Sequence, residues 1–214
     1  MPGVRDYLSR LEDLDPAGFE LAPAMDRLVL LTGQSSFMSS ALRAEQMDFL
    51  QAVAPPGARV CLLGFPWHHG LATPHDAPNL LAASWRNGQQ WWWTRRRGRF
   101  TDLLSGIVAR LRRHTAQRLL VVTGSCGIQL LAAALHGMDG PGPPISVFAL
   151  GPVGAAPAPG CLAGLEVAQG SRDGWSRLLW RGAVDHRPRC GHLDYYRDAA
   201  TREAARRFLA REAV

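Results

Sequence analysis

Residues 118–135 have the sequence RLLVVTGSCGIQLLAAAL, in which an apolar run, a turn of small residues and a second apolar run follow one another. The first run predicts a buried strand, and the second, from residue 128 to 135, predicts a helix. Ser125 stands at the centre of the turn. On such a strand-to-helix turn a serine hydroxyl is exposed above the sheet, and the first amides of the helix point towards it. The stretch therefore predicts an α/β fold with Ser125 as a candidate nucleophile.

Apolar segments elsewhere alternate between strand-like and helix-like patterns. Buried strands are predicted at residues 28–31, 59–64, 118–122, 145–150 and 165–168, and residues 183–186 are a candidate sixth strand. Amphipathic or apolar helices are predicted at residues 4–14, 38–53, 103–113, 128–135 and 201–212. Continuous apolar strands that alternate with helices indicate a mostly parallel sheet with helices on both faces.

A chain of 214 residues, 47% of them hydrophobic, fits one domain with a full core. We expect a single domain over residues 1–214. In it, residues 1–27 form an N-terminal helix and lead-in, and residues 66–100 form a tryptophan- and arginine-rich insertion or lid. The stretch from 151 to 164 contains mainly glycine, alanine and proline, so no cap domain is expected there.

The composition excludes several classes of protein. No lysine occurs in the chain, and the net charge of +6 is carried by arginine. A Walker A loop, a kinase phosphate-binding lysine and a Schiff-base enzyme all need lysine, so no cofactor of these classes is expected. The four cysteines form no CxxC pair, and no apolar stretch reaches the roughly 20 residues of a membrane helix. We expect reduced thiols, a cytoplasmic location and no membrane partner.

Two later motifs offer partners for Ser125. Asp173 stands just past the predicted strand at 165–168, and His192 lies in a loop after the last candidate strand. Carboxyl ends of parallel strands share one edge of a sheet, so these side chains could converge with Ser125. His192 would remove the serine proton, and Asp173 would fix the imidazole tautomer. Asp185 and His186 are the competing acid and base, and the sequence leaves them open.

Three motifs together resemble the α/β-hydrolase family: TGSCG at 123–127, GSRD at 170–173 and CGHLDYY at 190–196, in the order Ser, Asp, His. The resemblance spans roughly residues 28–212. It implies an oxyanion hole made by the backbone amides of Gln34, in the loop after the first strand, and of Cys126, the residue after the nucleophile. The pattern departs from the family at Thr123 and Ile128, where glycine is common.

The resemblance implies a serine hydrolase that cleaves an ester or thioester through an acyl-enzyme. One alternative is a non-catalytic binding protein of the same fold, in which Ser125 caps a helix. Another is an acyltransferase or acyl-eliminating enzyme with the same triad. The turn also resembles that of short-chain dehydrogenases. That interpretation fails, because two predicted strands precede the turn and the lysine of the Tyr-x-x-x-Lys pair is missing.

The segment from 66 to 100 offers a substrate platform. Trp91, Trp92 and Trp93 could cover an acyl or ring moiety, and Arg95 could hold an anionic group. The alternative is a packed surface loop with solvated arginines.

The expected partner is a small-molecule or carrier-bound acyl substrate, with an anionic form as one option. No nucleic acid is expected, because the basic run is short, and the sequence does not define an oligomeric state. No metal is expected either. Four residues of this segment carry possible metal-binding side chains, but their spacing matches no standard site: His68, His69, His75 and Asp76.

Overall fold

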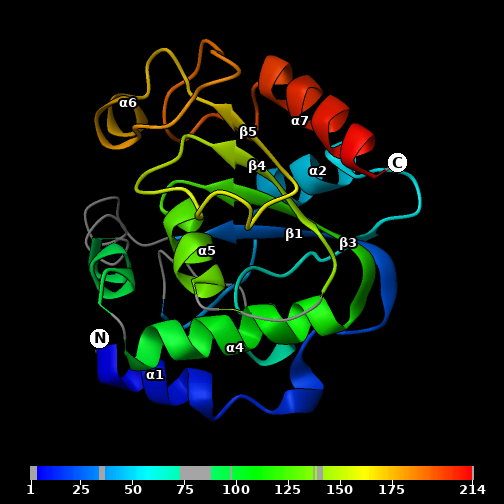
Figure 1. The fold of residues 1–214 in the computed structure, drawn as a ribbon, viewed down its shortest axis with the longest axis vertical. Helices are drawn as coiled ribbons and strands as arrows, with labels where there is room; N and C mark the ends of the chain where they lie inside the picture. The colour runs from blue at the N-terminus through cyan, green and yellow to red at the C-terminus, as the bar shows by residue number, and fades with distance from the viewer. Residues whose placement is uncertain are drawn as a thin grey trace.

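The computed structural model describes residues 4–33, 37–72, 88–96, 98–136, 138 and 142–213. Its centre is a five-stranded, all-parallel sheet in the order β2-β1-β3-β4-β5 (Figure 1). The strands are β1 (Ala24–Thr32), β2 (Arg59–Val60), β3 (Thr115–Gly124), β4 (Ile145–Leu150) and β5 (Gly164–Ala168). The predicted α/β class is confirmed. Residues 151–163, between β4 and β5, form a loop without a cap domain.

Helices cover both faces of the sheet. They are α1 (Val4–Glu12), α2 (Ala44–Val53), α4 (Arg99–Arg113), α5 (Gly127–Leu135), α6 (Gly174–Leu179) and α7 (Ala199–Glu212). The described chain also contains two short 3-10 helices, η1 (Pro16–Gly18) after α1 and η2 (His69–Leu71) after β2. Buried side chains of α1, α4 and α5 share one core cluster, and those of α2 and α7 share the other. None of the helices in these described ranges is long and apolar enough to cross a bilayer.

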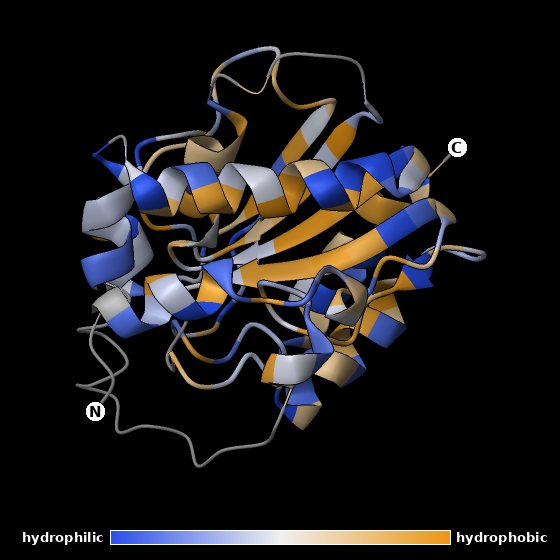
Figure 2. Ribbon diagram, turned by 90° about the horizontal axis from the view of Figure 1, so that it is seen from below, coloured by the Kyte–Doolittle hydropathy of each residue, from blue (hydrophilic) through white to orange (hydrophobic). Residues whose placement is uncertain are grey.

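The two clusters meet the sheet through alternate residues of each strand. In β1, Val29 and Leu31 belong to the cluster of α1, α4 and α5, whereas Leu28 and Leu30 belong to that of α2 and α7. Successive side chains of a strand point to opposite faces, so a strand covered on both sides is apolar throughout. Figure 2 shows largely hydrophobic strands between helices, with hydrophilic residues at some strand ends.

Two segments are less regular than the sequence predicts. The strand predicted at 59–64 contains only β2, because the chain then leaves the sheet and the Gly64 amide donates to the carbonyl of Ser40 (2.9 Å). The helix predicted from residue 38 begins only at Ala44. Residues before it are extended, with a bridge between Ala41 and Leu63, and the Gln46 side chain caps the amide of Arg43 (2.9 Å).

The chain after β5 also differs from prediction. The candidate strand at 183–186 contributes only an isolated bridge between Ala168 and His186. The side chain of Asp185, rather than a backbone carbonyl, accepts a hydrogen bond from the Val167 amide (2.8 Å), which interrupts regular strand pairing. Helix α6 was not predicted, because six residues are too few to show a helical period.

Gly127 lets α5 begin directly against β1. A Cβ atom on this residue would lie 2.0 Å from the carbonyl oxygen of Leu31, which is backbone and cannot rotate away. We expect Gly127→Ala to lower the free energy of unfolding in urea by about 3 kcal/mol. Gly106→Ala is the matched control, because its Cβ would meet no atom within 4 Å and alanine favours the helix. A Gly127→Ala protein as stable as the wild type would contradict this packing.

Candidate active site

Ser125 occupies a strained position between β3 and α5. Its φ of +52° lies in the left-handed region, which a serine adopts only when the surrounding structure holds it there. The Ser125 amide donates to the carbonyl of Leu150 (3.1 Å), and its own carbonyl accepts from the amide of Val153 (3.0 Å). Both bonds tie the turn to the end of β4. Thr123, where glycine is common in the resembling motif, lies inside β3, and its buried hydroxyl has no hydrogen-bond partner among the described residues.

His192 bridges Ser125 and Asp173. The Nε2 atom of His192 lies 3.0 Å from Oγ of Ser125. Its Nδ1 atom lies 2.9 Å and 3.0 Å from the two carboxylate oxygens of Asp173. The three residues predicted from separate motifs are therefore brought into one hydrogen-bonded chain. The arrangement matches that of a nucleophile, a base and an orienting acid.

Asp173 is fully buried and held on several sides. It caps α6 by accepting from the amide of Ser176 (3.0 Å), and it accepts from the hydroxyl of Tyr195 (2.6 Å). Burial by itself raises the pKa of this carboxyl. The hydrogen bonds from His192, Ser176 and Tyr195 outweigh burial, so the pKa of Asp173 lies below its ordinary value. The carboxylate is thus kept charged against the imidazole.

The competing acid and base have other partners. Asp185 accepts from the Val167 amide, and His186 lies 2.7 Å from a carboxylate oxygen of Glu166. The ring of His186 also lies 5.8 Å from that of Phe148. Neither residue contacts Ser125 in the described part of the chain. The geometry therefore favours Asp173 and His192.

Cys126 has the placement of an oxyanion donor and not of a nucleophile. It is the N-cap residue of α5, and no backbone carbonyl among the described residues accepts from its amide. Its side chain is buried, and burial raises the pKa of the thiol to about 12, which keeps it protonated at neutral pH. Gln34, the other predicted donor, lies outside the described residues.

The tryptophan segment is partly structural. Trp91, Trp92 and Trp93 lie in a helical stretch from 88 to 94. The ring of Trp93 packs near Phe37 and Phe100 at centroid distances of 6.0 Å and 5.5 Å. The guanidinium of Arg95 lies 4.4 Å from the ring centre of Trp91, and Trp92 is half exposed. No described contact joins these four predicted binding residues to the triad.

The predicted absence of a metal site concerns residues that are only partly described. His75 and Asp76 lie outside the described residues. His68 contacts the carbonyl of Asp15 (2.8 Å) and accepts from the amide of Gly70, so both its ring nitrogens are engaged. His69 lies 3.0 Å from a carboxylate oxygen of Glu20. Among the described residues, no three metal-binding side chains cluster.

Sequence reasoning missed two residues that shape the site. Tyr195 links the loop after β5 to the acid, because its hydroxyl accepts from the Gly170 amide (2.7 Å) and donates to Asp173. Gly151 has a φ of +51°, and a Cβ there would lie 2.5 Å from Oδ2 of Asp173. The available signals were a tyrosine three residues after His192 and a glycine directly after a buried strand.

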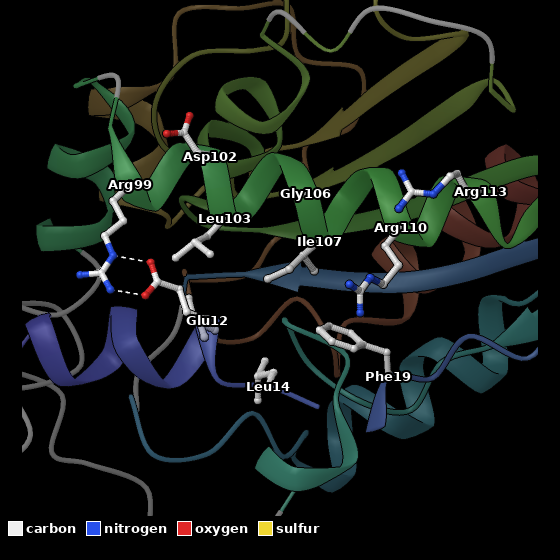
Figure 3. A pocket seen from close by; sticks show the side chains of 11 residues that line it. Glu12, Leu14, Phe19, Arg99, Asp102, Leu103, Gly106, Ile107, Arg110 and Arg113 are labelled. Atoms are coloured by element: carbon white, nitrogen blue, oxygen red, sulfur yellow. Dashed lines mark hydrogen bonds and ion pairs between the residues drawn. The ribbon is translucent and has the colours of Figure 1, made fainter. Parts of the chain in front are cut away.

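A groove of about 630 Å³ lies between α1 and α4 (Figure 3). Leu14 and Phe19 form part of its apolar lining, Arg110 stacks over the Phe19 ring at 4.7 Å, and Glu12 pairs with Arg99. None of the triad residues lines it. It is therefore separate from the candidate active site.

No protein-family model matches the chain, and no curated protein or solved structure shows significant similarity to it. The function is therefore inferred from the chemistry of the site.

Proposed function

We propose that this chain is a serine hydrolase of the α/β-hydrolase type, which cleaves an ester or thioester through an acyl-enzyme. The observation that carries the proposal is the hydrogen-bonded chain from Oγ of Ser125 through His192 to the buried carboxylate of Asp173. The positive φ of Ser125 also supports the proposal, because nucleophiles in this chemistry typically have a strained backbone on a strand-to-helix turn.

In the proposed reaction, Nε2 of His192 accepts the proton of Ser125 as Oγ attacks the substrate carbonyl carbon. Asp173 accepts from the Nδ1–H group and stabilises the imidazolium that forms. The proton then passes from His192 to the leaving alcohol or thiol, and the carbonyl–leaving-group bond breaks to give an acyl-enzyme. His192 then removes a proton from water as the water oxygen attacks the acyl carbon. The bond between the acyl carbon and Oγ breaks, the acid leaves, and the proton on His192 passes to Oγ of Ser125.

The amide of Cys126 is the proposed donor to the oxyanion of the tetrahedral intermediate. Such a donor contributes about 3 kcal/mol to the stability of the transition state. The amide of Gln34 remains the second proposed donor. No cofactor takes part in these steps.

The proposed substrate is a small-molecule or carrier-bound acyl compound, for which Trp91, Trp92, Trp93 and Arg95 remain proposed contacts. A cytoplasmic location is also part of the proposal. It is supported by the four cysteines, which are all free thiols.

A fluorophosphonate probe tests the proposal directly. We expect one equivalent to attach to Ser125 in the wild-type protein, as seen by intact mass, because His192 activates this hydroxyl. Labelling should disappear in Ser125→Ala and persist in Ser171→Ala, which changes an exposed serine near the acid. A folded wild-type protein that stays unlabelled would favour the non-catalytic alternative instead. Product analysis with a second acyl acceptor then separates hydrolysis from acyl transfer.

A further inference from the structure

Large apolar side chains are exposed beside the triad. Trp175, Leu178 and Leu179 are 61%, 60% and 39% exposed, and they stand at positions i, i+3 and i+4 of α6, so they share one face. Leu193, the residue after His192, is 55% exposed. We call these four side chains the α6 patch. Exposed apolar side chains are ordinary when scattered, but a group of them marks an interaction site.

The α6 patch is fixed to the catalytic residues through the backbone. Asp173 is the N-cap of α6, and the opposite side of the helix turns the buried Ser176 inwards. At the other end of α6, the carbonyl of Leu179 accepts from the Gly154 amide (3.4 Å), next to the residue that binds the Ser125 carbonyl. In Figure 1, α6 lies near the carboxyl ends of β4 and β5. The patch therefore flanks the triad.

Exposed arginines lie in and next to α6 in the sequence. Between residues 171 and 190, exposed positive charges stand at Arg172, Arg177, Arg181, Arg187 and Arg189. None of them forms an ion pair with a carboxylate in the described part of the chain. Arg172 and Arg177 donate instead to backbone carbonyls, those of Arg189 (2.8 Å) and Ser171 (3.3 Å).

The acidic groups of this region are engaged elsewhere. Asp173 faces His192, Asp185 accepts from the Val167 amide, and Asp194 accepts from the Gly191 amide (2.9 Å). Arg206 and Arg207 of α7 differ, since both pair with Glu203. Between residues 171 and 190 five arginines stand against two carboxylates, so the region around α6 combines protruding apolar side chains with an excess of positive charge.

We infer that the α6 patch and its arginines form a contact surface for a membrane of anionic lipid. Tryptophan and leucine enter the boundary between headgroups and acyl chains, and arginines bind the phosphates. Side chains more than half exposed protrude, which suits a deformable lipid layer better than a rigid protein surface. The sequence expectation of no membrane partner rests on the lack of a spanning helix and does not address such a peripheral contact.

The contact itself does not depend on catalysis, but its consequence rests on the proposed function. A bound protein would hold Ser125 close to the lipid surface. Its substrates would then include acyl esters embedded in or emerging from that surface.

Co-sedimentation with vesicles tests the contact, using Ser125→Ala protein so that no lipid is cleaved. We expect binding to vesicles of phosphatidylglycerol and phosphatidylcholine in equal parts and none to phosphatidylcholine alone. Replacing Arg181 and Arg189 by serine should weaken binding about fivefold for each arginine, and high salt should act in the same direction. Replacing Trp175 and Leu178 by serine should weaken it about tenfold or more.

Matched controls stand on other surfaces. Met25→Ser removes an equally exposed apolar side chain at the start of β1, and Arg206→Ser with Arg207→Ser removes two charges from α7. These controls should bind as the parent protein does. The inference is overturned if the parent protein ignores anionic vesicles, or if the α6 variants and the controls bind equally. Binding to poly-glutamate or single-stranded DNA but not to vesicles would assign the surface to an acidic macromolecule and would overturn it as well. Because none of these outcomes involves turnover, failure here is distinct from failure of fluorophosphonate labelling.

Discussion

Replacing His192 by alanine is expected to lower kcat for a p-nitrophenyl ester by about a millionfold. Among the described residues, His192 is the base hydrogen-bonded to Oγ of Ser125, and without its imidazole none of them is placed to take the proton (the Nε2–Oγ distance is 3.0 Å). Nucleophile and base act as a unit, so losing the base costs about as much as losing the whole triad. Steady-state kinetics with protein free of contaminating esterase measures the effect.

His186→Ala is the matched control for this prediction. His186 is also partly buried and also pairs with a carboxylate, Glu166, but it does not contact Ser125. We expect its kcat to stay within a fewfold of the wild-type value. Comparable losses in the two variants would show that the base has been wrongly assigned, provided that both proteins give native circular dichroism.

Asp173→Asn is expected to lower kcat by about ten-thousandfold. An amide can donate to Nδ1 and so favours the imidazole tautomer that presents a proton, rather than a lone pair, to Ser125. The amide of Ser176 would still donate to Oδ1, and the hydroxyl of Tyr195 would accept from the new NH2 group in place of donating, so the side chain keeps two anchors and the loss would reflect the tautomer more than misfolding. The same ester assay measures it, with thermal unfolding as the check on structure.

Asp185→Asn separates the two acids that the sequence leaves open. Asp185 accepts a hydrogen bond from the Val167 amide. Among the described residues, His192 bonds to Asp173 and not to Asp185. We expect the variant to keep wild-type kcat. If activity fell at position 185 and survived at position 173, the acid would have to be reassigned.

The fold and the triad follow from signals that are local in sequence. The strand–turn–helix pattern around Ser125 predicts the centre of the sheet, because continuous apolar strands form only between two covered faces. Parallel order then brings the segments after β3 and β5 to one edge, which is why Asp173 could be predicted. The choice between Asp173 and Asp185 depends on the contacts of Nδ1 of His192 with the Asp173 carboxylate, which no sequence pattern predicts.

The remaining features depend on contacts between distant segments. Tyr195 supports Asp173 through its hydroxyl, yet in the sequence it is one of two adjacent aromatic residues with nothing to distinguish them. Helix α6 has too few residues for a period to show. The sequence leaves Trp93 open between a substrate contact and a packed side chain, because tryptophan suits both roles, and its contacts with Phe37 and Phe100 are seen only in the fold.

The parallel order of the sheet gives the three triad residues a common dependence on folding. Ser125 follows β3 at the middle of the sheet, Asp173 follows β5 at its edge, and His192 lies before α7. They meet only after β3, β4 and β5 have aligned and the chain has returned over them. Fluorophosphonate labelling of Ser125 would therefore report that the C-terminal half of the molecule has folded completely. A partly folded chain would contain all three residues but would not react with the probe.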